Sequence, residues 1–162
     1  MNTDTRLEAQ VGVALLARGW TVCTAESCTG GLVAHRLTNI AGSSAYLIGG
    51  IVAYSYEAKG SLLGVPAETL EKYGAVSAET AEAMVLGALR AFGASIAVSI
   101  TGIAGPGGGT AQKRVGLTYF GVATSMGALQ VDQQTWDGDR EGNKAQSADH
   151  ALRLLLAMIG AG

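Results

Sequence analysis

A serine at a strand-to-helix junction is the side chain of this sequence best placed for chemistry. Ser27 lies in the segment 25–31, where an extended stretch gives way to a helix expected to begin near Thr29. At such a junction a hydroxyl can lie among unpaired backbone N–H groups, near the positive end of a helix dipole. That setting suits a serine nucleophile, an anion-binding site or an ordinary helix cap. The residues around Ser27 alone leave all three open.

A serine nucleophile needs a base that removes its proton. Neither His35 nor His150 stands in a Ser-His-Asp pattern, and the glycines of a G-x-S-x-G turn are absent. Lys59 is the remaining candidate base, and it would require a pKa lowered by burial in a site that excludes water. Tyr54 could relay the proton or orient a substrate. The alternative for Lys59 is a surface lysine paired with a neighbouring glutamate.

A glycine-rich loop, residues 102–109, follows an apolar strand expected over residues 95–100. Glycine allows close backbone approach, and successive N–H groups can hold a phosphate. The loop fits neither standard phosphate-binding pattern, since Gly108 stands where a P-loop needs lysine and no G-x-G-x-x-G is present. It is therefore either a ligand-binding edge or a long flexible turn.

The hydrophobic pattern alternates helices with strands early in the chain and gives adjacent strands later. Helices are expected around residues 7–15, 29–37, 57–63, 77–92 and 145–159, and strands around 20–24, 46–54, 95–100, 115–124 and 129–136. This order predicts a three-layer α/β/α sandwich around a mixed sheet, with residues 1–162 forming one domain. Polar positions follow several of these strands, at the edge where open α/β sheets bind ligands.

Composition narrows the class of protein. A net charge of −2 without a basic run argues against nucleic acid or an anionic membrane as the main partner. Two cysteines, Cys23 and Cys28, form neither a disulfide framework nor a zinc pattern, which favours a reducing compartment. With no apparent signal peptide and no uninterrupted apolar span, we expect a cytoplasmic protein. Apolar helix faces and few charges favour a homo-oligomer.

Six motifs, in order along nearly the whole chain, resemble the C-terminal domain of the CinA (competence/damage-inducible) family. They are residues 25–31, 52–55 with 57–59, 63–65, 74–77, 101–110 and 138–140. Two departures stand out: Tyr56 replaces an expected asparagine, and residues 111–114 replace a proline-containing stretch. The resemblance implies a mixed, mostly parallel sheet with one antiparallel strand.

The same resemblance implies a reaction, because stand-alone members of the family include nicotinamide-nucleotide amidases. The expected reaction converts nicotinamide mononucleotide to nicotinic acid mononucleotide and ammonia, with no metal or other cofactor. Ser27 would attack the carboxamide, Lys59 would act as base, and backbone N–H groups would hold the oxyanion. We assign catalysis to Ser27, Tyr54 and Lys59, and substrate binding to Thr29, Gly30, Thr101, Gly105, Gly107, Gly108 and Arg140.

Two rival functions remain at this point. A non-catalytic nucleotide-binding or assembly module would keep the pocket and bind without turnover. A serine amidase for another small carboxamide would keep the chemistry and differ in substrate. In each case the expected partner is a small molecule.

Overall fold

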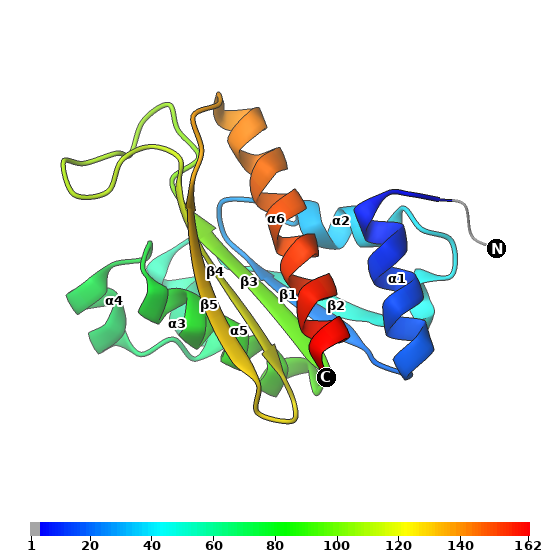
Figure 1. Cartoon of the computed structure of the whole chain (residues 1–162). Helices are drawn as coiled ribbons and strands as arrows, with labels where there is room; N and C mark the ends of the chain where they lie inside the picture. The colour runs from blue at the N-terminus through cyan, green and yellow to red at the C-terminus, as the bar shows by residue number, and fades with distance from the viewer. Residues whose placement is uncertain (1–3) are drawn as a thin grey trace.

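A single sheet organises the residues that the computed structural model describes, 4–162 (Figure 1). Its strands run in the order β2-β1-β3-β4-β5. They are β1 Val22–Glu26, β2 Leu47–Val52, β3 Ile96–Gly102, β4 Leu117–Thr124 and β5 Leu129–Thr135. β1 pairs in parallel with β2 and with β3, whereas β4 pairs antiparallel with β3 and with β5.

The expectation of a mostly parallel sheet is not confirmed. The two antiparallel pairings join the three longest strands, so antiparallel ladder makes up the larger part of the sheet. The short turn around residues 125–127 explains one of them, because a tight hairpin returns the chain beside itself in the opposite direction. The two adjacent strands expected around residues 115–124 and 129–136 are confirmed, and they form this hairpin as β4 and β5.

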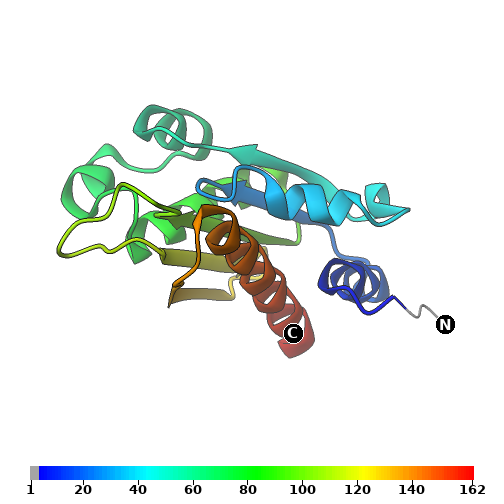
Figure 2. The same ribbon diagram turned by 90° about the horizontal axis from the view of Figure 1, so that it is seen from above.

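Helices lie on both sides of the sheet (Figure 2). They are α1 Leu7–Arg18, α2 Leu32–Thr38, α3 Tyr56–Leu63, α4 Ala67–Tyr73, α5 Ala78–Phe92 and α6 Arg140–Ala161, with a short 3-10 helix, η1, at Ser43–Ala45. α2 and α6 contact one face and α5 contacts the other, while α1, α3 and α4 rest chiefly on other helices. A regular three-layer sandwich is therefore not confirmed, although the α/β class is.

Two apolar cores follow from the alternation of side chains along each strand. On β3, Ile96, Val98 and Ile100 join the cluster beneath α1, α2 and α6. Ala97, between them, joins the cluster beneath α3 and α5. At the end of β1, the consecutive residues Glu26 and Ser27 likewise contact helices on opposite sides of the sheet: Glu26 contacts α2 and Ser27 contacts α3.

Local signals fixed most element boundaries. Gly19 ends α1 in the left-handed conformation, and the Ser77 hydroxyl caps α5 by accepting from the Thr80 N–H. One boundary differs from expectation: α2 begins at Leu32 rather than near Thr29. Gly30 and Gly31 have φ of 61° and 98°, so the chain makes a turn before the helix can start.

Two absences hold for residues 4–162. No helix in that range combines the length and apolar character needed to cross a membrane. The same residues contain no cluster of three or more His, Cys, Asp or Glu side chains that could hold a metal ion.

Candidate active site

Three chain segments meet at one edge of the sheet because β1, β2 and β3 run in the same direction. Ser27 follows β1, Tyr54 follows β2 and Thr101 lies near the end of β3. Backbone hydrogen bonds hold these ends together: the Ser27 N–H donates to Ile100 O at 2.9 Å, and the Ala53 N–H donates to the residue before Ser27 at 2.9 Å. The carboxyl end of parallel strands is a common place for ligands.

Ser27 and Lys59 meet directly at this edge. The Lys59 Nζ lies 3.0 Å from the Ser27 Oγ. Lys59 is only 1% exposed and Ser27 only 7% exposed. Lys59 lies in the first turns of α3. The Ser55 hydroxyl caps this helix by accepting from the Ala58 N–H, and this cap fixes where the helix begins. The sequence placed these two residues in one site, and the structure brings them into contact.

The surroundings of Lys59 favour its neutral form. Its Nζ also lies 2.9 Å from Ala53 O and 3.4 Å from Tyr54 O, and among residues 4–162 it forms no ion pair with a carboxylate. Burial lowers the pKa of Lys59 below its ordinary value of 10.5. In the structure the Nζ donates to all three oxygens; a neutral amine can keep the same contacts, because its two N–H groups donate to the carbonyls and its lone pair accepts from the hydroxyl.

The turn after Ser27 leaves backbone donors free. Within the described residues, the N–H groups of Cys28, Thr29 and Gly31 have no hydrogen-bond acceptor on another residue. The Cys28 thiol is no rival nucleophile, because burial raises its pKa to about 12. The turn therefore places the Ser27 hydroxyl beside several N–H groups that no other described residue uses.

Glu26 is a buried carboxylate that the sequence reading did not single out as part of the site. It is 0% exposed. Four groups donate to it: Thr24 Oγ1 at 3.1 Å, Thr29 Oγ1 at 2.7 Å, Val33 N at 2.9 Å and Ala34 N at 3.0 Å. An acidic residue directly before Ser27, ahead of a helix with no capping side chain at Gly31, was the available signal.

Arg140 joins two of the predicted segments. It donates to Gly105 O at 2.7 Å and to the Tyr54 phenol oxygen at 3.1 Å. The Tyr54 residue is 61% exposed, and within residues 4–162 its phenol contacts Arg140 rather than Ser27 or Lys59. The structure thus brings Tyr54 to Lys59 through its carbonyl and, through the contact of its phenol with Arg140, to the glycine loop.

The remaining predicted residues divide into two groups. The hydroxyls of Thr29 and Thr101 are buried and donate inward, the second to Ala75 O at 2.6 Å. Gly30, Gly107 and Gly108 are exposed. The glycine loop extends away from the sheet (Figure 1) and is tied to the end of α4, where Lys113 Nζ donates to Tyr73 O at 2.5 Å.

A cavity of about 490 Å³ lies beside the glycine loop, lined by Ala104, Gly105, Pro106, Val115, Gly138, Asp139, Arg140 and Glu141. Asn143, which the sequence reading missed, holds two of its walls together. Its Nδ2 donates to Ala104 O at 3.0 Å and its Oδ1 accepts from the Gly138 N–H at 2.9 Å. A polar side chain, 2% exposed, on the inner face of α6 was its signal. Ser27 and Lys59 do not line this cavity.

Known proteins resemble this chain over nearly its full length. The family model described as the CinA C-terminal domain matches residues 4–159. The nicotinamide-nucleotide amidohydrolase PncC of Enterobacter agglomerans is 51% identical over 150 residues, which cover 93% of this chain and 92% of that protein. PncC of Escherichia coli K12 is 50% identical, covering 93% and 91%.

Longer relatives and solved structures agree with this similarity. A putative competence-damage inducible protein of Moorella thermoacetica is 52% identical over 98% of this chain, but only 38% of its own length is matched. The crystal structure of the competence/damage inducible protein CihA from Agrobacterium tumefaciens has a TM-score of 0.91 and 43% identity, covering 93% of this chain and 92% of that one.

Proposed function

The chain belongs to the CinA C-terminal domain family, and on this premise we propose that it is a nicotinamide-nucleotide amidohydrolase. We propose nicotinamide mononucleotide as the substrate and nicotinic acid mononucleotide and ammonia as products. Relatives about half identical along nearly their whole length carry the general activity in their names. The chemistry needs an activated nucleophile, donors for an oxyanion and an anchor for the nucleotide.

The contact of 3.0 Å between Lys59 Nζ and Ser27 Oγ carries this proposal. An uncharged amine held by two backbone carbonyls can take the hydroxyl proton as the oxygen attacks. A protonated lysine cannot, so the low exposure of Lys59 and the absence of a carboxylate partner in the described residues favour a base role.

The reaction then runs in two halves. Ser27 Oγ bonds to the carboxamide carbon while Lys59 takes the hydroxyl proton, giving a tetrahedral oxyanion. Lys59 returns the proton to the amide nitrogen, the C–N bond breaks and ammonia leaves an acyl ester on Ser27. Water attacks this ester with Lys59 as base, the C–O bond breaks, and the proton returns to Ser27 as the acid is released.

The oxyanion would be held by the free N–H groups of Cys28 and Thr29, which adjoin the nucleophile. Preorganised backbone donors stabilise charge that develops only in the transition state. Loss of one such donor typically costs roughly 3–4 kcal/mol of this stabilisation. The turn offers these donors without a conformational change, because no other residue in the range 4–162 accepts from them.

The 5′-phosphate would bind Arg140 beside the glycine loop. A guanidinium has five N–H donors, and the contacts of Arg140 to Gly105 O and to the Tyr54 phenol leave others free for a bidentate phosphate. The cavity of about 490 Å³ lined by Arg140 and Gly105 gives this group a place. In this assignment Tyr54 orients the anchor and, through its carbonyl, the base.

The test is ammonia release from nicotinamide mononucleotide by the native protein and by Ser27→Ala. We expect release by the native protein and a loss of at least about 10³-fold in kcat for the variant. Ser61→Ala, which removes an exposed serine on α3, is the matched control and should keep full activity. No release by the native protein, or equal release by Ser27→Ala, would reject the proposal.

A further inference from the structure

Glu26 and Ser27 are consecutive residues that engage opposite faces of the sheet. Ser27 Oγ contacts Lys59 of α3, whereas the Glu26 carboxylate contacts α2 through the N–H groups of Val33 and Ala34. No hydrogen bond joins the carboxylate to Ser27 or Lys59. Glu26 therefore takes no part in the proton transfer itself.

The four donors to Glu26 come from three different places. One is the strand, through Thr24; one is the turn, through Thr29; and two are N–H groups in the first turn of α2, those of Val33 and Ala34. The strand before the turn, the turn itself and the helix after it are thus hydrogen-bonded to one buried carboxylate. A carboxylate can accept all of these bonds at once, because it has four lone-pair sites and no N–H or O–H of its own.

This arrangement decides which backbone donors of the segment remain free. The carboxylate uses the N–H groups of Val33 and Ala34, which would otherwise be open at the start of α2. The unused donors are then those next to Ser27, on Cys28, Thr29 and Gly31. The bond from the Thr29 hydroxyl holds the residue whose own N–H we propose as an oxyanion donor.

We infer that Glu26 is a positioning residue that holds the turn of residues 27–31 in its reactive form through Thr29. This inference rests on the proposed amidase reaction. It differs from a plain helix cap in one respect: the bond to the turn should control the rate of the chemical step, whereas the bond to the strand should affect only stability.

Two buried threonines make a matched pair for the experiment. Thr29→Val removes the donor in the turn and Thr24→Val removes the donor in the strand; each donates to a different carboxylate oxygen. Both variants should lose similar amounts in Tm. Thr29→Val should lower kcat roughly 10- to 100-fold, as small misplacements of reacting groups do, with little change in KM. Thr24→Val should keep kcat, and Thr29→Ser should restore it.

A second readout separates this inference from the proposed function. A fluorophosphonate probe reports the reactivity of Ser27 without the nucleotide, with the labelled residue located by mass spectrometry. Slower labelling of Thr29→Val than of Thr24→Val supports the inference even if native protein releases no ammonia from the nucleotide, an outcome that overturns only the substrate. Equal kcat and equal labelling in the two valine variants would overturn the role of Glu26. Absence of both labelling and ammonia release from native protein would overturn both proposals.

Discussion

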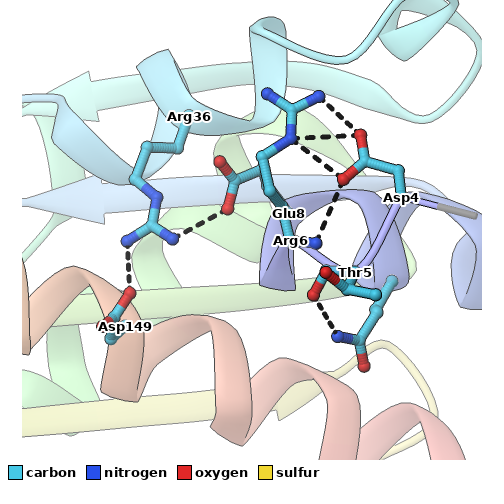
Figure 3. Close-up of polar contacts among 7 residues, drawn as sticks. Asp4, Thr5, Arg6, Glu8, Arg36 and Asp149 are labelled. Carbon is cyan, nitrogen blue, oxygen red and sulfur yellow. Dashed lines mark hydrogen bonds and ion pairs between the residues drawn. The ribbon is translucent and has the colours of Figure 1, made fainter.

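Arg36 and Lys59 are two basic side chains withdrawn from solvent at opposite sides of the sheet. Arg36, on α2, lies between Glu8 of α1 at 2.7 Å and Asp149 of α6 at 2.6 Å (Figure 3). Lys59, on α3, lies between two backbone carbonyls and the Ser27 hydroxyl. Burial disfavours charge at both places.

The hydrogen-bond partners of each side chain decide whether its pKa is raised or lowered. At Arg36, burial is outweighed by the hydrogen bonds to Glu8 and Asp149, so its pKa is raised. At Lys59, burial lowers the pKa, and within residues 4–162 no carboxylate pairs with the amine to oppose this. The first region uses a positive charge to join three helices, and in the second we propose that the lowered pKa lets the amine act as a base. The carboxylate partners, rather than burial alone, set the direction of the pKa shift at each place.

Removing the Lys59 amine should have the largest effect. Lys59→Met keeps the length of the side chain without a base, so kcat for ammonia release should fall about 10²- to 10⁴-fold, the range typical of a lost general base. Folding should persist, as circular dichroism would show. Lys72→Met, on the exposed face of α4, is the control and should leave kcat unchanged. Activity within tenfold of native would mean that Lys59 is not the base.

As pH falls, the activity that depends on Lys59 should be lost before the stability that depends on the pairing of Glu8 with Arg36. Below the lowered pKa of Lys59, kcat should fall about tenfold per pH unit, since only the neutral amine reacts. At Glu8, burial is outweighed by the bond from Arg36, and the pKa lies below its ordinary 4.5. The stability that Glu8 supplies is therefore fully present above its ordinary pKa of 4.5, and it is lost as pH falls through the lowered pKa of the folded protein. Profiles of kcat and Tm against pH should separate, and coincident profiles would contradict this.

Breaking the Arg36 cluster should destabilise the fold and spare the chemistry. Arg36→Met leaves Glu8, which is 5% exposed, without its cation, at a cost of about 1–3 kcal/mol in the free energy of unfolding. Urea unfolding measures this, and kcat at low temperature should stay within twofold. Arg153→Met, exposed on α6, is the control and should change stability by less than about 0.5 kcal/mol. A large fall in kcat for Arg36→Met would show that the two regions are coupled.

Sequence reasoning reached the groups whose roles depend on local pattern. Ser27 stood at a strand-to-helix junction, a signal that spans only a few residues. Lys59 was proposed because no histidine fitted, and the geometry places it beside Ser27. The catalytic roles assigned to Ser27 and Lys59 remain predictions.

Groups that depend on tertiary contact were not predictable in the same way. The joining of Tyr54 to Arg140 needs the packed structure, because these two residues lie far apart in the sequence and topology brings them together. The share of antiparallel ladder was likewise missed, since a pattern of strands does not state which pairings are longest. Long-range pairs such as Arg36 with Asp149 leave no periodic trace.

The smallest effect on stability is expected when the ion pair between Asp149 and Arg36 is removed. The side chain of Asp149 is 49% exposed, against 7% for Glu8, so water screens its pairing with Arg36. Asp149→Asn should lower the free energy of unfolding by only about 0.2–1 kcal/mol, and the difference should shrink further in 1 M salt. Glu8→Gln in the same urea assay should cost more and depend less on salt, because its pair with Arg36 is the less exposed one. Equal, salt-insensitive losses in the two variants would mean that Asp149 is as sequestered in solution as Glu8, and that partner number, rather than burial of the partner, sets the strength of this cluster.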